Sequence, residues 1–164
     1  MNNFSIIIPA FNESKNLSIL LDEIILNCLN NYNYQIIIVD DKSEDNTQNI
    51  IKKRKEKNIK LISNKYNQGQ SYSIHRGIQE ADYENIITID ADLQNDPKDI
   101  PKIAEIYFYN KNIKLVAGIR TNRKDNMIKI VSSKIANFVR SLILKDNCPD
   151  TGCSLKIFDK SFFL

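Results

Sequence analysis

Two local patterns meet in the stretch Ile86-Ile87-Thr88-Ile89-Asp90-Ala91-Asp92-Leu93-Gln94-Asn95-Asp96-Pro97. Its first four residues lack polar alternation, which is typical of a strand buried on both faces of a parallel sheet. Asp96 and Pro97 then indicate a helix start, because aspartate caps a first turn and proline fits it. Between strand and helix stand Asp90, Asp92 and Gln94. The stretch therefore predicts an acidic turn at the carboxyl end of a buried strand.

The same pattern recurs along the chain, with apolar runs at 4–8, 36–39, 59–62, 86–89 and 115–117. We expect Pro9 to end the first of them. Helical spacing lies between the runs, for example at Leu17, Leu20, Leu21, Ile24 and Cys28. Alternating strands and helices predict an α/β fold with right-handed crossovers: a Rossmann-like, mostly parallel sheet flanked by helices, in a single domain over 1–164.

Composition excludes several classes of protein. The formal charge of +3, from 23 basic and 20 acidic residues, is too small to indicate nucleic-acid binding. Cys28, Cys148 and Cys153 form no CxxC pair, so neither a zinc site nor a disulfide framework is expected. We expect Cys28 to be a buried thiol, and a reducing, cytoplasmic location. Neither a signal peptide nor a membrane-spanning run is expected.

Acidic side chains follow several of the predicted strands. In an open α/β sheet, ligands bind at the carboxyl ends of the strands. Five carboxylates should converge there, and they are Glu13, Asp40, Asp41, Asp90 and Asp92. Like charges so close repel one another, which favours a bound cation. Carboxylate and amide oxygens suit Mg²⁺ or Mn²⁺, which often share phosphate ligands with a substrate, so Asp90, Asp92 and Gln94 are the predicted metal ligands.

Asp41 has two interpretations: it accepts hydrogen bonds from a nucleoside, or it caps the helix that starts near Asp45. A phospho-receiver domain would also gather acids at strand ends. However, its third strand should end in aspartate, and here that strand ends in Ser63-Asn64-Lys65. His75 is the only histidine, which disfavours a zinc hydrolase and a Ser-His-Asp triad. Gly69, before the next helix, is suited to a positive φ or a close backbone approach.

Two features near the end of the chain are basic. Arg120 and Arg123 follow the fifth predicted strand, where guanidinium groups suit diphosphate or phosphate recognition, and a solvated basic loop is the alternative. An apolar stripe over 128–142, flanked by lysines and an arginine, predicts a helix. Such a helix packs on the sheet or lies on an anionic membrane surface.

Together these residues resemble the family 2 glycosyltransferases, which have the GT-A fold. The resemblance is carried by four collinear segments, 5–13, 39–47, 67–69 and 89–97. The Asp-Ala-Asp-Leu-Gln-x-x-Pro version of the last segment is similar to the polyprenyl-phosphate branch, that of dolichol-phosphate mannose synthase and its bacterial relatives. The segment 150–156 is similar to that branch's sequence near the acceptor. Two positions depart from the family: Lys42 stands where glycine is usual, and Gln70 where lysine is usual.

The resemblance implies roles for particular residues. The nucleoside would be cradled by Pro9, Phe11, Glu13, Val39 and Asp41. The rest of the donor would be bound by Asp90, Ala91, Asp92 and Arg120. Mg²⁺ or Mn²⁺ would be held by Asp90, Asp92 and Gln94. Arg123 would bind the acceptor, and Asp150 is the candidate catalytic residue, which orients the acceptor and need not be a base.

We therefore expect an inverting, metal-dependent transfer from a GDP- or UDP-sugar to a polyprenyl phosphate, peripheral to the cytoplasmic face of the membrane. The alternatives are transfer to a saccharide hydroxyl and a non-catalytic nucleotide-binding fragment. Family members generally continue with acceptor-binding and membrane-associated segments, so we expect this chain to lack them. The expected partners are the donor, the lipid acceptor and a membrane surface, without nucleic acid. A homo-oligomer is compatible with the sequence.

Overall fold

The computed structural model describes residues 2–28, 31–110, 112–119 and 150–163. Its strands are β1 (Asn3–Ala10), β2 (Asn33–Asp40), β3 (Ile59–Ser63), β4 (Asn85–Thr88), β5 (Leu115–Ala117) and β6 (Lys156–Asp159). Its helices are α1 (Leu17–Cys28), α2 (Thr47–Lys52), α3 (Gln70–Gln79) and α4 (Ile100–Tyr109), with 3₁₀ turns at Pro97–Asp99 and Lys160–Phe162. The helix expected over 128–142 lies outside the described residues.

The six strands form one sheet in the order β3-β2-β1-β4-β6-β5. The neighbours among β1 to β4 pair in parallel, whereas β6 runs antiparallel to both β4 and β5. The predicted mostly parallel α/β sheet is thus confirmed. β6 was not predicted, and it separates β4 from β5.

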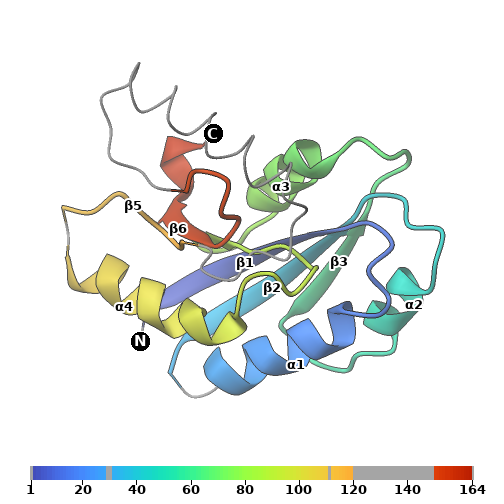
Figure 1. Ribbon diagram of the computed structural model, residues 1–164, viewed down its shortest axis with the longest axis horizontal. Helices are drawn as coiled ribbons and strands as arrows, with labels where there is room; N and C mark the ends of the chain where they lie inside the picture. The colour runs from blue at the N-terminus through green and yellow to red at the C-terminus, as the bar shows by residue number, and fades with distance from the viewer. Residues whose placement is uncertain (1, 29–30, 111, 120–149, 164) are drawn as a thin grey trace.

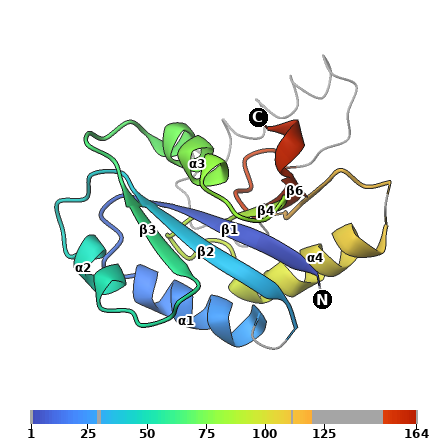
Figure 2. The same cartoon turned by 180° about the vertical axis from the view of Figure 1, so that it is seen from behind.

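Helices cover both faces of the sheet. Strand side chains alternate between faces, so Ile6 and Ile8 of β1 pack with α1 and α4, whereas Ile7 packs with Ile78 of α3. Figures 1 and 2 show α1, α2 and α4 along one face and α3 on the other. The apolar stripe predicted for α1 is buried along its length. Cys28 at its end is a buried thiol as expected, and burial raises its pKa to about 12.

The prediction that Pro9 ends the first strand was wrong, because β1 continues to Ala10. The Ile7 carbonyl accepts a hydrogen bond from the N–H of Ile89, the residue that follows β4 (3.2 Å). Backbone groups of alternate residues point to the same side of a strand, so the nitrogen of Pro9 also faces β4. The β1–β4 register ends at the Ile7–Thr88 pair. Proline is tolerated here because no carbonyl of β4 needs its missing N–H.

The predicted start of the helix after the acidic turn is confirmed. The Asp96 carboxylate accepts a hydrogen bond from Lys98 N (3.0 Å), and Pro97 occupies the first turn. Within the described part of the chain, no helix is long and apolar enough to cross a membrane.

Candidate functional site

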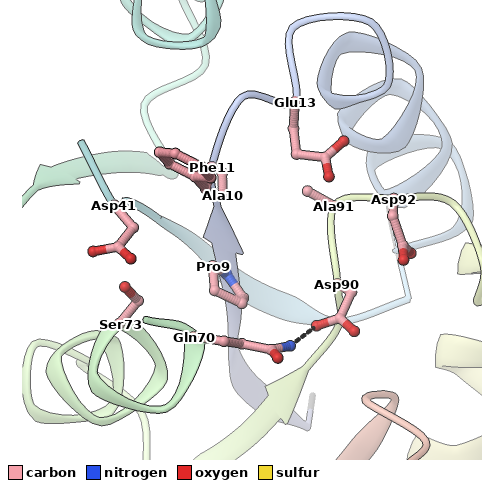
Figure 3. Close-up of a pocket in the computed structure, with 10 residues that line it drawn as sticks. All are labelled: Pro9, Ala10, Phe11, Glu13, Asp41, Gln70, Ser73, Asp90, Ala91 and Asp92. Carbon is pink, nitrogen blue, oxygen red and sulfur yellow. Dashed lines mark hydrogen bonds between the residues drawn. The ribbon is translucent and has the colours of Figure 1, made fainter. Parts of the chain in front are cut away.

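A pocket of about 230 Å³ lies at the carboxyl ends of the parallel strands, where β1 and β4 diverge (Figure 3). The chain leaves β1 toward β2 on one side, while β4 flanks the other, so this is the switch point where ligands bind in open α/β sheets. The pocket is lined by Pro9, Ala10, Phe11, Glu13, Asp41, Gln70, Ser73, Asp90, Ala91 and Asp92. Seven of these were predicted as donor-binding residues.

The acidic turn after β4 brings Asp90 and Asp92 to this pocket. Leu93 adopts a left-handed conformation with φ of 61°, and the Asp92 carboxylate accepts from Gln94 N (3.0 Å). The turn is closed by Ser154, whose hydroxyl accepts from Asp90 N (3.1 Å) and from the Asn95 side-chain amide (2.8 Å). The segment that leads into β6 therefore holds the shape of the acidic turn.

Two carboxylates at one pocket fit a divalent cation that shares its ligands with a substrate. Mg²⁺ is commonly bound by one or two carboxylates together with substrate phosphates and waters. Among the described residues, no cluster of three histidine, cysteine, aspartate or glutamate side chains could hold a metal alone. Gln94 is exposed and is not among the residues that line the pocket. Of the three predicted metal ligands, Asp90 and Asp92 line the pocket and Gln94 does not.

Asp41 lines the pocket, and the residue is only 4% exposed. Its oxygens accept from Asn64 Nδ2 (2.7 Å), Gln68 N (2.9 Å) and Gly69 N (2.7 Å). Burial raises the pKa of this carboxyl, but the hydrogen bonds outweigh burial, and the net pKa is lowered. Asp41 thus holds the backbone just before α3, where the N-cap residue Gly69 has the predicted positive φ (87°). It does not cap α2, which was the alternative interpretation.

Hydrogen bonds connect the loops after β1 and β2 beside the pocket. Asn12 Oδ1 accepts a hydrogen bond from Glu44 N (2.8 Å), and Thr47 Oγ1 accepts one from Glu13 N (2.9 Å). Asp45 accepts from Ser14 N (3.1 Å) and Thr47 N (2.9 Å). Burial raises the pKa of Asp45, yet these hydrogen bonds dominate and lower it to about 2. This loop pair holds Phe11 and Glu13 at the pocket.

Lys42, which stands where the family usually has glycine, adopts a backbone conformation typical of glycine. The residue adopts a φ of 67°, in the left-handed region that glycine favours. Asn12 (φ 57°) and Leu93 do the same. All three non-glycine residues of this kind in the described part lie in the loops after β1, β2 and β4. The left-handed conformation costs roughly 1–2 kcal/mol at each of them.

The remaining predicted residues lie elsewhere. Val39 is fully buried beneath α3 and does not line the pocket. Asp150 is 3% exposed, and its carboxylate accepts from Gly152 N (3.2 Å). Arg120 and Arg123 lie outside the described residues.

Sequence reasoning did not identify Gln70 and Ser73 as lining residues. Both lie on α3 at a spacing of three, which places them on one face of the helix. Gln70 Nε2 donates to Asp90 Oδ1 (2.5 Å), and Ser73 Oγ accepts from Asn64 Nδ2 (3.0 Å). Two signals were available in the sequence: the position of this helix directly after Gly69, and the departure from the usual lysine at Gln70.

A sequence model described as Glycosyl transferase family 2 matches residues 5–164. The chain belongs to glycosyl transferase family 2. The resemblance inferred from the four collinear segments is thereby confirmed, and the acidic turn and Asp41 both lie within the matched range.

Similar family 2 proteins come from bacteria. The chain is 31% identical over 162 residues to the undecaprenyl-phosphate 4-deoxy-4-formamido-L-arabinose transferase of Pectobacterium atrosepticum, covering 96% of this chain and 49% of that protein. The enzyme of the same name from Proteus mirabilis is 33% identical over 163 residues, with the same coverage. The chain therefore spans about half the length of the curated relatives it matches.

Solved structures share the fold. S. aureus TarS 1-349 in complex with UDP-GlcNAc superposes with a TM-score of 0.67 at 21% identity, covering 99% of this chain and 46% of TarS. Glucosyl-3-phosphoglycerate synthase from Mycobacterium tuberculosis, in complex with Mn²⁺, UDP and glucosyl-3-phosphoglycerate, gives 0.77 at 15% identity, covering 98% and 57%. At such identities the likeness concerns the fold alone, and it confirms the predicted GT-A architecture.

Proposed function

We propose that this chain carries the donor site of an inverting glycosyltransferase that moves a sugar from a UDP- or GDP-sugar to a polyprenyl phosphate, with Mg²⁺ or Mn²⁺. The observation that carries the proposal is the pairing of Asp90 and Asp92 in one pocket with Asp41 and Phe11. In Figure 3 the two aspartates lie on one side of the pocket, with Asp41 and Phe11 on the other.

This arrangement divides the donor between two subsites. The Phe11 side chain is 46% exposed at the pocket, so its ring is available to a nucleobase. Asp41 lies on the same side and would accept a hydrogen bond from the nucleoside. Asp90 and Asp92 would hold the cation against the diphosphate. When bound, the cation stabilises the charge of the departing nucleoside diphosphate as a Lewis acid.

The acceptor chemistry needs little help from a base. Inversion requires attack on the anomeric carbon from the face opposite the leaving group. A phosphate monoester is already largely ionised at neutral pH, with a second pKa near ~6. Asp150 would therefore orient the acceptor rather than deprotonate it. Its segment is tethered to the acidic turn, because Ser154, four residues on, binds Asp90 N.

Support for a lipid phosphate acceptor comes from the relatives, whose names specify an undecaprenyl phosphate. With such an acceptor, we propose that the protein works at the cytoplasmic face of the membrane as a peripheral protein. Arg120 would contact the donor diphosphate and Arg123 the acceptor phosphate. Transfer to a saccharide hydroxyl remains the alternative activity, and nucleotide binding without transfer is the other.

The decisive experiment for the metal site uses Asp92→Asn, which preserves the size of the side chain. The substituted side chain keeps an oxygen that can accept from Gln94 N, so folding should remain intact while Mn²⁺-dependent UDP or GDP binding is lost. Isothermal titration with and without chelator measures this. Unchanged diphosphate affinity in the variant would refute the assignment.

A second assay identifies the acceptor. Undecaprenyl phosphate, dolichyl phosphate and a set of free oligosaccharides are offered with UDP- and GDP-sugars. A product on a lipid phosphate is expected. A product on a saccharide alone would favour the alternative activity, and binding of the donor without any product would favour the non-catalytic reading.

A further inference from the structure

One hydroxyl oxygen holds both ends of the acidic turn. Ser154 Oγ accepts from the N–H of Asp90, where the turn begins (3.1 Å), and from the side-chain amide of Asn95, where it ends (2.8 Å). A serine hydroxyl has two acceptor lone pairs, and each end of the turn occupies one of them. Ser154 follows Asp90 by 64 residues in the chain, so the shape of the turn depends on a tertiary contact.

The two partners of this contact are themselves held in place. The Ser154 carbonyl accepts from Thr88 Oγ1 (2.6 Å), and β6 pairs with β4 from Lys156 onward. Asn95 is only 7% exposed, and its Oδ1 accepts from the Cys153 thiol (3.1 Å), so its Nδ2 is directed at Ser154. The hydroxyl is therefore fixed relative to the end of β4 before any ligand binds.

The turn carries two carboxylates that would oppose its shape. Asp90 and Asp92 line the same pocket (Figure 3). Carboxylates that approach one point repel each other until a cation binds between them. The Ser154 hydroxyl resists this repulsion without using either carboxylate, because it binds a backbone N–H at one end of the turn and a side-chain amide at the other. Groups that orient metal ligands from outside the ligand set commonly have a strong effect on metal affinity.

We propose that Ser154 is a positioning residue that sets the affinity of the donor site for its divalent cation, because its hydroxyl keeps the acidic turn in the shape that binds the cation. The proposal rests on the proposed function, in which Asp90 and Asp92 hold the cation against the donor diphosphate. It gives the segment that leads into β6, whose Asp150 would orient the acceptor, a second role in binding of the donor.

The test compares wild type with three variants. Ser154→Ala removes the hydroxyl, whereas Ser154→Thr retains it. Thr88→Val is the matched control, because it removes the hydrogen bond to the Ser154 carbonyl and leaves both hydrogen bonds to the hydroxyl. Mn²⁺ binding in the presence of UDP or GDP is followed by electron paramagnetic resonance, and binding of the same nucleotides in EDTA by isothermal titration. Urea unfolding measures the stability of each variant.

Ser154→Ala should weaken Mn²⁺ binding by about fivefold or more, while nucleotide binding in EDTA should change by no more than about twofold. Ser154→Thr and Thr88→Val should keep Mn²⁺ affinity within about twofold of wild type, although Thr88→Val should lower the free energy of unfolding. The proposal is overturned if Ser154→Ala binds Mn²⁺ as wild type does. It is also overturned if Ser154→Thr or Thr88→Val loses as much Mn²⁺ affinity as Ser154→Ala, since the hydroxyl would then not be the determinant. Absence of Mn²⁺-dependent nucleotide binding in wild type would instead refute the proposed function.

Discussion

At the scale of single residues, Asp41 links the architecture of the pocket to its chemistry. Its carboxylate lines the pocket and accepts three hydrogen bonds of 2.9 Å or less from the loop before α3 and from Asn64. Asn64 is held in turn by Arg76, whose guanidinium donates to Asn64 Oδ1 (2.6 Å) and to Ser63 O (2.9 Å). The orientation of Asp41 is therefore fixed before any nucleoside binds.

We expect Asp41→Ala to weaken binding of UMP or GMP even in chelator, and to destabilise the fold by about 2–4 kcal/mol. The stability loss arises because the buried Asn64 amide loses its acceptor, and the partly buried Gln68 and Gly69 N–H groups lose theirs. Equilibrium unfolding in urea and isothermal titration measure the two effects.

Asn64→Ala is the matched control, because Asn64 does not line the pocket. It removes one donor to Asp41 and should lower stability while largely sparing nucleotide affinity. If both variants weakened nucleotide binding equally, Asp41 would act only through the loop. If Asp41→Ala had an effect only with metal present, its assignment to the nucleoside would be wrong.

The residues at this scale differ in how far sequence could predict them. Asp90 and Asp92 were placed correctly at the sheet edge because they directly follow an apolar strand, and parallel strands end at one edge. The partners of Asp41 and Asp90 could not be predicted, since Asn64 and Gln70 meet them only through the packing of α3 on the sheet. The resemblance to the family marked Gln70 only as a departure from the usual lysine, and it did not indicate which group the Gln70 amide would contact.

At the scale of elements, the hydrogen-bonded loops after β1 and β2 should make the free energy of unfolding sensitive to acid. The folded pKa of Asp45 is depressed from 3.8 to about 2, and that of Asp41 is also lowered. A depressed pKa contributes stability that is present above the unfolded value and is lost as pH falls through the folded value. Unfolding free energy should therefore decline between about pH 4 and pH 2.

Asp45→Asn should flatten this decline, because the variant has no carboxyl to protonate there. Urea unfolding at several pH values provides the measurement, with Asp82→Asn as a comparison at a surface carboxyl outside the two loops. An identical slope in wild type and Asp45→Asn would show that the loop pair does not depend on this charge.

Gly77 sets how closely α3 approaches the sheet. A Cβ at this position would lie 2.5 Å from Ile7 Cγ2 and 3.1 Å from Val39 Cγ2. Gly77→Ala should therefore cost about 1–3 kcal/mol through overpacking, offset by about 1 kcal/mol of helix propensity. A net loss of up to about 2 kcal/mol is expected in urea unfolding, with a weaker contact between Gln70 and Asp90.

Ser71→Ala on the same helix is the control, because Ser71 is exposed and alanine favours the helix. It should change stability by no more than about 0.5 kcal/mol. Gly77→Ala with wild-type stability would mean that α3 can move outward at little cost.

The elements also show where sequence patterns stop being informative. Short apolar runs predicted β1 to β5 to within a few residues. The expected burial on both faces is confirmed for β1, β2 and β4, which lie inside the sheet. It was wrong for β3 and β5, which are the edge strands and are partly exposed. β6 is only Lys156–Asp159, with charged residues at both ends. Its antiparallel place between β4 and β5 depends on which sheet edge is open, and no local pattern in those four residues encodes that.

At the scale of the whole molecule, metal and nucleotide should stabilise the fold together more than either does alone. Two carboxylates are an incomplete set for Mn²⁺, and the diphosphate completes it. At a ligand concentration of 100 times Kd, stabilisation of about 2.7 kcal/mol is expected, or roughly 5–10 °C in Tm for a domain of this size. A thermal-shift panel of UDP and GDP with and without Mn²⁺ measures this.

Asp92→Asn serves as the control in the same panel and should lose the joint shift. The better of the two nucleotides identifies the base that the pocket accepts. If Mn²⁺ alone gave the full shift in Tm, the diphosphate would not be needed to complete the set of metal ligands, and the prediction would be wrong.

The place of β6 in the sheet has a consequence for folding during synthesis. β1 to β4 come from the first part of the chain and can pair as they emerge, whereas β5 pairs with β6 and has to wait for it. At roughly 5–20 residues per second, several seconds separate β4 from β6 on the ribosome. During that interval the outer edge of β4 is open to mispairing. Ser154, which closes the acidic turn, arrives with β6, so the part of the site that would hold the metal takes its final shape near the end of translation of this segment.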